Sequence, residues 1–556
     1  MNNYFSTKSI IRTKLNETKR FLLACLVCAT ITAVPSCDLK YFESTEFGDI
    51  IFDPSLAIPV GSITYTVAEL FEELNEGGAV IAPNAEDVVT LTFTETLQSQ
   101  SASGFLTVLD QNFGSSLASG TNLSNPPIAT TISVSELYSF DLSQTGDEAY
   151  DSILFSAGSF DFTASSDIGA DVDFTASFIS LEDAAGQIVM NGSLPSGGAA
   201  FSQSASLVNG KGLFHLDDQG NPSSSKFLVR IEYTISVGPT NSITADQRVS
   251  FNLGINNTTF QTIYGNVGNQ ALNVGEQDIS LDFFSTFDGG NITFADPTIR
   301  FIFDNSFGFP LGIDFQQITA VSGSGTNIPL QGAVVDNLQV VNAPTITQQG
   351  DFVRTEIEIN AGNSNIADLL SSKPTRFLVN VGAESNPTNV PAAYNFIDIS
   401  NILDASVEIE VPLELNINGL TAEEVVNFTS GADLSDATRL LFRVIAENEL
   451  PLGGRVELQF RDGSGNVIYT VDDRPAFTAA SVGLDGRTNE VAMSTVDILI
   501  PEEGIRIIEN ATTINVVATL STTDAQSGAS VKLFNDYELR FQLAVQADAR
   551  VNLNGN

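Results

Sequence analysis

Apolar and polar side chains alternate with a period of two through much of the chain. The alternation is clear at 171–178, 227–237 and 247–255, and it is longest in the final stretch, 537–553. Because successive side chains of a strand point to opposite faces, this period predicts strands with one buried and one solvated face. Gly, Asn and Ser separate the stretches and are typical of turns. The pattern predicts an all-β chain of tandem β-sandwich domains, Ig-like or jelly-roll-like, with a few short helices.

Helical signals are few and short. Thr66 and Glu69 have the spacing of a capping box, which predicts a helix over 67–74, and Thr421 and Glu424 predict another over 422–428. Three further local expectations are a short helix over 365–372, a short helix or turn over 133–140, and a strand over 88–97 that pairs with 105–109.

The 556 residues suffice for three or four domains. Changes in strand and turn spacing divide the chain into a signal peptide at 1–36, a lipid-anchored tether at 37–52, an N-terminal β unit with a short helix at 53–145, a β-sandwich at 146–290, a middle β-sandwich at 291–410 and a last β-sandwich at 411–556.

The last segment reads as a diverged copy of 146–290. Both contain a hairpin turn followed by similar letters, G-Q-I-V from Gly186 and G-N-V-I from Gly465, and both end in a pair of long alternating strands. Pro-Leu-Gly occurs at 310–312 and again at 451–453, each time after an asparagine. Pro presets a turn and Asn and Gly tolerate left-handed backbone, so turn chemistry explains the shared letters.

The first 37 residues have the layout of a secretory leader. Lys and Arg precede an apolar stretch at 21–34, which is about the length of a signal segment and too short to span a bilayer as a helix. Small residues then lead to Cys37, as in a bacterial lipobox, and predict lipidation there. Cys25 lies too close to the basic residues, and Cys28 follows the bulky Val27. A plain leader cut near Ser36, or an uncleaved signal helix, is the alternative.

Four short motifs follow the leader: D-P-x-L-x-x-P-V at 53–60, Y-G-x-x-G at 264–268, D-P-x-I-x-F at 296–301 and N-S-x-G-x-P at 305–310. Together with the lipobox, this arrangement resembles outer-membrane and cell-surface lipoproteins of Bacteroidota-type bacteria with repeated β-sandwich domains. The resemblance implies an outer-membrane, lipid-anchored protein. In that group acids just after the lipid cysteine can direct export to the surface. Here Asp38 is the one acid close to it, so the side of the membrane stays open.

The chain is strongly acidic, with a net charge of −43. The leader holds five of the 24 Lys and Arg and one of the 67 Asp and Glu, so the rest keeps 19 against 66, a net −47. This sign argues against nucleic acid and against an anionic lipid surface as partners. Solubility explains the acidity most simply. Structural calcium is the sharper reading, with oxygen-rich loops at Asp217, Asp218 and at Asp462, Asn466, which also read as ordinary hairpin turns.

The sequence offers little catalytic chemistry. The three cysteines all lie within 25–37, His215 is the one histidine, and tryptophan is absent. His215 has no G-x-S-x-G partner motif and reads as a strand-end surface residue. No cofactor is expected beyond a structural calcium ion.

Two functions from different classes remain. The leading hypothesis is a non-enzymatic envelope lipoprotein, a binding or scaffolding β-sandwich array that serves an outer-membrane complex or acts as an adhesin or spacer, with a protein partner in addition to the membrane. The alternative is a surface hydrolase, such as a glycosidase, that uses a pair of carboxylates about 5–10 Å apart in a deep pocket.

Overall fold

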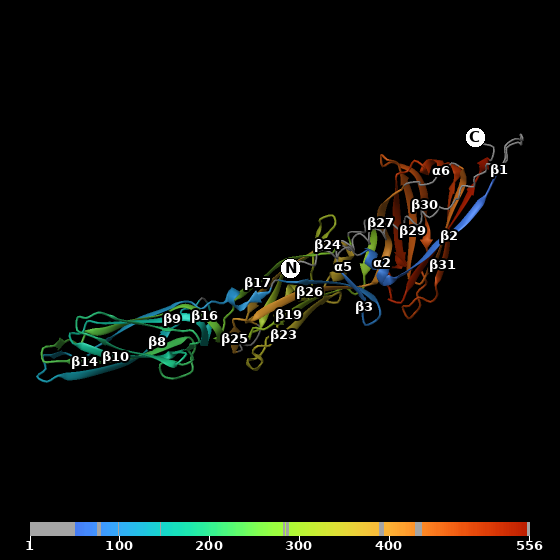
Figure 1. Cartoon of the computed structure of the whole chain (residues 1–556). Helices are drawn as coiled ribbons and strands as arrows, with labels where there is room; N and C mark the ends of the chain where they lie inside the picture. The colour runs from blue at the N-terminus through green and yellow to red at the C-terminus, as the bar shows by residue number, and fades with distance from the viewer. Residues whose placement is uncertain are drawn as a thin grey trace.

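The computed structural model describes residues 51–74, 79–97, 99–144, 146–281, 284, 289–388, 394–428 and 436–552. The protein is an elongated body of three β-rich lobes in a row (Figure 1). Strands account for 62% and helices for 7% of the residues that the structure describes, and the sheets are antiparallel, which confirms the expected all-β, multi-domain class. The predicted signal peptide and Cys37 lie outside the described residues.

The distal lobe, drawn in cyan and green in Figure 1, is built from one continuous stretch of chain. Its strands are β6 (Gln111–Ala118), β7 (Leu123–Ser124), β8 (Thr130–Asp141), β9 (Ala149–Ser166), β10 (Asp171–Asp183), β11 (Gly186–Leu194), β12 (Phe201–Ser206), β13 (Lys211–Leu213), β14 (Lys226–Val237), β15 (Ser242–Ile243) and β16 (Arg248–Asn266).

The middle lobe contains strands from both sides of that stretch. They are β3 (Val80–Pro83), β4 (Val89–Thr96), β5 (Gln100–Ser101), β17 (Ala271–Ser280), β19 (Thr298–Asn305), β20 (Leu311–Ser322), β21 (Asn327–Pro329), β22 (Gln339–Val341), β23 (Val353–Asn360), β24 (Pro374–Ser385), β25 (Asn395–Asp398) and β26 (Ile402–Pro412). Short helices α3 (Ala102–Phe105), α4 (Ala333–Asp336), η2 (Ile346–Gln348) and α5 (Ile366–Ser371) connect them.

The terminal lobe combines the first described residues with the last. It holds β1 (Ile51–Phe52), β2 (Ser55–Thr66), α2 (Val67–Leu74), β18 (Gly289–Phe294), β27 (Glu414–Asn427), β28 (Ala437–Asn448), β29 (Leu452–Arg461), β30 (Val467–Phe477), β31 (Ala492–Pro501), α6 (Glu502–Ile508), β32 (Thr513–Thr522), η3 (Ala525–Ser527), β33 (Val531–Lys532), β34 (Glu538–Ala549) and β35 (Val551–Asn552).

The lobes are nested rather than consecutive. The chain leaves the far end of the terminal lobe along β2, crosses the middle lobe in β3 to β5, builds the distal lobe, and returns through the middle lobe to the terminal lobe. At the far end Ile51 pairs with Asn552, so the first and last described strands lie side by side. The sheets therefore do not follow the predicted boundaries, and the stretch 53–145 supplies strands to all three lobes.

One sheet folds over on itself in the distal lobe; among the described residues it has ten strands, nine from the distal lobe and β25 from the middle lobe, which pairs with the end of β16. Its path runs β25-β16-β9-β13-β10-β14-β8, with β6 added to β16. The two ends of the path nevertheless meet, because the Tyr138 hydroxyl on β8 donates to the Ser116 carbonyl on β6 and the Tyr138 ring packs edge-on against Phe251 on β16 at 5.0 Å. The result is a closed sandwich with an aromatic core.

The other two lobes each pair two separate sheets. In the middle lobe β23-β19-β26-β4-β3 faces β17-β24-β20-β21, and the rings of Phe301 and Phe315 meet between them at 4.7 Å. In the terminal lobe β18-β27-β32-β29-β30 faces β2-β34-β28-β31, and Phe477 contacts Phe541 at 5.7 Å. One hydrophobic core runs through all three lobes, and a second, smaller one fills the far end of the terminal lobe.

Several local expectations are confirmed. The helix α2 spans the predicted 67–74, and its capping box is complete, because Thr66 Oγ1 accepts from the Glu69 N–H at 3.3 Å while the Glu69 carboxylate accepts from the Thr66 N–H at 2.9 Å. The strand expected at 88–97 is β4, and the helix expected at 365–372 is α5.

Three local expectations are wrong. The stretch 133–140 lies within β8 and 422–428 lies almost entirely within β27, both strands. The stretch 105–109 forms no strand, and β4 pairs instead with β3 and β26. In each case pairing with a strand distant in sequence overrides a local propensity, as happens readily for β-branched segments such as Val425 and Val426.

The shared asparagine before Pro-Leu-Gly has a role that sequence reasoning missed. Asn305 and Asn448 are both fully buried. Asn448 Nδ2 donates to the carbonyls of Leu452 and Thr478 at 2.8 and 2.7 Å, and its Oδ1 accepts from the Leu450 N–H at 2.9 Å. Asn305 makes the equivalent set of three bonds. The side-chain amide, rather than a left-handed backbone, holds both corners together.

The glycines of the Y-G-x-x-G motif are required by backbone geometry. Gly265 and Gly268 have φ of +132° and +71°, values that side chains rarely tolerate. A Cβ at Gly265 would lie 2.3 Å from the Ala149 carbonyl oxygen, since β16 crosses close to β9 there. The motif marks the bend where the chain leaves the distal lobe.

Replacing a corner asparagine tests its structural role. Asn448→Ala leaves the buried Leu450 N–H, the buried Leu452 carbonyl and the partly buried Thr478 carbonyl without their partner, so we expect a loss of about 2–3 kcal/mol in the free energy of unfolding. Urea unfolding followed by circular dichroism measures it. The matched control is Asn466→Ala in an exposed turn, for which we expect less than about 1 kcal/mol. Equal losses for the two variants would contradict the assignment.

Candidate functional site

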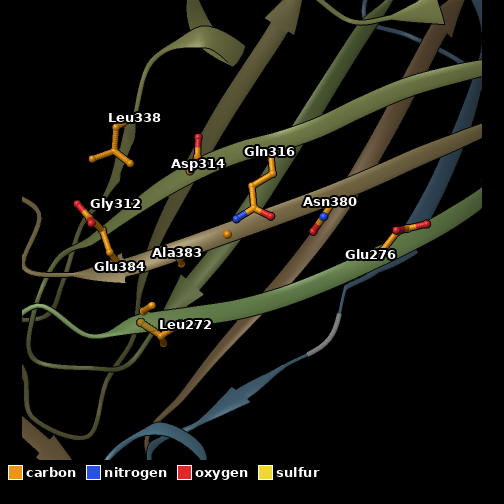
Figure 2. Close-up of a pocket in the computed structure, with 11 residues that line it drawn as sticks. Leu272, Glu276, Gly312, Asp314, Gln316, Leu338, Asn380, Ala383 and Glu384 are labelled. Atoms are coloured by element: carbon orange, nitrogen blue, oxygen red, sulfur yellow. The ribbon is translucent and has the colours of Figure 1, made fainter. Parts of the chain in front are cut away.

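A broad hollow of about 610 Å³ lies on the outer face of the β17-β24-β20 sheet in the middle lobe (Figure 2). Polar side chains project into it from all three strands, with Leu338 at its rim. Its lining residues are Ala271, Leu272, Glu276, Gly312, Asp314, Gln316, Leu338, Asn380, Gly382, Ala383 and Glu384.

Two irregularities of the sheet produce the hollow. The pairing of β24 shifts register on both sides, at Asn273–Gly275 of β17 and at Phe315–Gln317 of β20. Bulges of this kind bend a strand and redirect its side chains. Between them Gly382 carries no side chain, and a Cβ there would lie 2.5 Å from Gln316 Nε2. Gln316 therefore lies over the bare backbone of β24.

The chemistry of the hollow is that of a hydrogen-bonding surface. Gln316 and Asn380 offer amide donors and acceptors, and Glu276, Asp314 and Glu384 offer carboxylates from three different strands. Asp314 pairs with Gly382, so Glu384, two residues along, is its diagonal neighbour, roughly 7–8 Å away between Cα atoms. Such a surface suits a polar or cationic group presented by a partner.

Sequence reasoning missed this hollow. Its residues belong to strands that are far apart in the chain, for example Glu276 and Asn380, which are paired across β17 and β24. The alternation of polar residues was visible, but the two register shifts depend on the neighbouring strands. Only the unusual adjacency of the exposed Gln316 and Gln317 signals a bulge in the sequence.

In the two loops proposed for calcium, the aspartate carboxylate oxygens accept hydrogen bonds from within the same turn. Asp217 Oδ1 accepts from the N–H groups of Gln219 and Asn221 at 2.9 and 2.8 Å, and Oδ2 accepts from Asn221 Nδ2 at 3.1 Å. Asp462 has the same three bonds, with Ser464 and Asn466 as donors. Asp218 is an exposed neighbour in its loop. The structure keeps the two candidate loops in different lobes.

The same turn occurs twice more with neutral acceptors. Asn84 Oδ1 accepts from the N–H groups of Glu86 and Val88, and Ser322 Oγ accepts from the Thr326 N–H. Turns of this kind therefore also form around an amide or a hydroxyl oxygen. In the described part of the chain, no three His, Cys, Asp or Glu side chains form a group suited to holding a metal ion.

The histidine that was weighed for catalysis is on the surface. His215 is exposed, and its carbonyl accepts from the Ser223 N–H beside the Asp217 turn. This is the strand-end position that the sequence indicated.

The chain has few Lys and Arg residues, and several of them form ion pairs with carboxylates on a neighbouring strand. Arg300 on β19 has carboxylates on both sides, with Glu408 on β26 at 2.7 Å and Glu356 on β23 at 3.9 Å. Arg443 on β28 and Arg376 on β24 each take both oxygens of an aspartate on the adjacent strand. Acids remain in excess on the surface, because they outnumber Lys and Arg by 67 to 24.

The junction between the distal and middle lobes is a buried polar network. Asn386 Nδ2 donates to the Gly268 carbonyl at 2.9 Å and to Asn395 Oδ1 at 2.8 Å. The Ser385 hydroxyl donates to the same Gly268 carbonyl and accepts from the Gln270 N–H, both at 2.8 Å. These bonds tie the end of β24 to the segment that follows β16, which restricts bending between the lobes.

The junction between the middle and terminal lobes combines a continuous backbone with an ionic cluster. One buried residue, Leu413, separates β26 in the middle lobe from β27 in the terminal lobe. Lys532 of the terminal lobe pairs with Glu86 in the turn between β3 and β4 at 2.7 Å, and Arg487 of the terminal lobe pairs with Asp87 in the same turn at 3.6 Å. Contacts on both sides of the joint hold the two lobes in line.

No protein-family model and no curated protein matches the sequence. Among solved structures, the chain is similar to a protein of Parabacteroides distasonis described as secreted, with 15% identity, a TM-score of 0.29, and coverage of 50% of this chain and 82% of that one.

Two weaker similarities are to a structure of infectious bursal disease virus, Gt strain, at 8% identity and TM-score 0.14 with 78% and 83% coverage, and to the tandem CBM22 domains of Paenibacillus barcinonensis Xyn10C, at 10% identity and TM-score 0.13 with 52% and 87% coverage. Values this low assign neither a function nor a site. No helix in the described residues has the length and apolarity needed to cross a bilayer.

The hydrogen bonds in the turn at Asp462 predict that the stability of the folded protein depends on pH. Hydrogen bonds from the backbone and side chain of Asn466 hold the pKa of Asp462 below its usual value. A depressed folded pKa contributes stability that is present above the unfolded pKa, near 4, and is lost as the pH falls through the folded pKa. Asp462→Asn keeps the Oδ1 acceptor without a titrating group.

We therefore expect the wild-type melting temperature to exceed that of Asp462→Asn at pH 7 and the difference to narrow below about pH 4. Thermal melts across pH measure both. Adding millimolar calcium at pH 7 provides the control, and we expect no change with it. A calcium-dependent rise that Asp462→Asn abolishes would restore the metal interpretation.

Proposed function

We propose that this protein is a non-enzymatic, lipid-anchored envelope protein that works as a rigid partner-binding spacer. The observation that carries the proposal is the path of the chain. It runs from the far end of the terminal lobe out to the distal lobe and back, so the first and last described strands pair at the same end. An anchor placed before Ile51 would hold the body by that end.

The anchor of this proposal is Cys37. Thirteen residues lie between it and Ile51, a segment that spans at most about 50 Å when fully extended. Three acyl chains on that cysteine would attach the terminal lobe to the outer membrane and leave the middle and distal lobes projecting away from it. The proposed location is the outer membrane. Experiment must decide whether the protein is on the periplasmic side or on the cell surface.

Rigidity supports a spacing role. Domains joined by flexible linkers move independently by default. Here the joints are the network around Asn386 and Asn395, the direct passage of the chain from β26 to β27 through the buried Leu413, and the ion pairs of Arg487 with Asp87 and of Lys532 with Glu86. Joints of this kind fix the orientation of each lobe relative to the next as well as the distance between the lobes.

The partner-binding surface of the proposal is the hollow on the β17-β24-β20 sheet. It combines amides with three carboxylates in an acidic protein, so the partner that fits it best presents lysine, arginine or hydrogen-bond donors. A partner in the outer membrane or at the cell surface would be reached from the side of the spacer.

Lipidation can be tested with the three cysteines. We expect Cys37→Ala to abolish incorporation of an alkyne-labelled fatty acid and to move the protein from the membrane to the soluble fraction of the cell. The matched controls are Cys25→Ala and Cys28→Ala, which should keep both label and membrane attachment. Labelling and fractionation of whole cells measure the effect. Label that survives Cys37→Ala would overturn the anchor.

Partner binding can be tested with a photo-crosslinking amino acid in intact envelopes. Placed at Asn380 in the hollow, it should yield one discrete protein adduct. Placed at Gln526, an exposed position of the terminal lobe, it should yield none. Mass spectrometry identifies the adduct, and Asp314→Ala combined with Glu384→Ala should reduce it at least about tenfold. Adducts from both positions, or from neither, would contradict the hollow as the partner surface.

A further inference from the structure

A separate, enclosed cavity of about 160 Å³ lies inside the terminal lobe, between its two sheets. Eleven residues from eight elements surround it, among them Tyr65, Leu70, Phe71, Ile292, Leu420 and Leu520. It is distinct from the hollow of the middle lobe, with which it shares no residue.

The wall of this cavity is aliphatic and aromatic throughout. Leu420, Leu452 and Leu539 are buried, and Phe477 and Phe541 close one side with an edge-to-face contact at 5.7 Å. A buried water needs two to four polar partners, so a space with such a wall stays dry. Empty space of this size destabilises a core in proportion to its volume, because its lining loses contact atoms.

The helix α2 explains why the space is not filled by the sheets. The capping box of Thr66 and Glu69 turns the chain from β2 into a helix of eight residues at the end of the sandwich. Leu70 and Phe71 on that helix line the cavity, and Leu70 is only half-buried. The helix therefore forms part of the cavity wall, together with residues of both sheets.

We propose that this cavity binds a compact apolar group of about six carbon atoms, either an aromatic ring or the tip of an acyl chain. The size supports this class, since an engineered apolar cavity of about 150 Å³ in another protein stays dry and binds benzene or xenon. The aromatic and branched wall offers dispersion contacts on every side and no hydrogen-bond partner for a polar ligand. The site does not depend on the proposed spacer role.

The test measures the melting temperature of the full chain with benzene and, separately, with octanoate below its micelle concentration. Binding to the folded state alone raises the melting temperature with ligand concentration. We expect a rise of several degrees with benzene. A further rise with octanoate assigns the site to acyl chains, and a rise with benzene alone assigns it to rings. No rise with either overturns the proposal.

Variants separate the cavity from general effects on stability. Leu420→Phe combined with Leu539→Phe fills the space and should remove the benzene response. Leu420→Ala enlarges the space and should increase the response. The matched control is Leu440→Ala, which truncates a buried leucine of the second core and should leave the response as in the wild type. Xenon binding followed by 129Xe NMR on the wild type and Leu420→Ala supplies a readout that does not depend on the filled variant folding. An unchanged response in Leu420→Ala, with xenon signals equal to those of the Leu440→Ala control, would overturn the assignment.

Discussion

Pairing between the outgoing and returning legs of the chain is the interaction on which the rest of the structure depends. Backbone groups in a sheet must be paired, and one outgoing strand in each lobe finds its main partner on the return: β2 on β34, β4 on β26 and β6 on β16. Ser55 lies opposite Asp548, almost the whole chain away. Closing such distant ladders costs loop entropy before it yields contacts, so a fold of this kind forms slowly and as a nested whole.

Buried polar groups provide the definite geometry that pairing alone does not. Asn305 and Asn448 hold two equivalent corners, and Asn386 and Asn395 join the distal lobe to the middle lobe. Each buried amide costs desolvation free energy unless its bonds are made, so a shifted or bent arrangement that breaks them is strongly disfavoured. This is the physical basis for treating the three lobes as one rigid body, and the spacer proposal depends on it.

Many of the acidic side chains stabilise the fold. Aspartates cap turns at Asp217 and Asp462, and others pair with arginines across strands, as at Arg443 and Asp497. The remaining acids stay on the surface, and some of them border the hollow beside β24. The same residue type therefore serves three purposes, which is why composition suggested calcium while the turn geometry accounts for the loops with no metal at all.

The sequence by itself determined the strand-rich class, the helix at α2 with its capping box, the hairpin turns at Asp217 and Asp462, and the surface position of His215. Those features depend on side chains a few residues apart, and such local patterns can be read directly. Only the tertiary structure decided the nesting of the lobes, the strand character of 133–140, the hollow around Gly382 and the cavity behind α2. Each of these depends on which distant strands become neighbours. An alternation of period two shows that a strand has two different faces, but it does not show which other strands or side chains each face contacts.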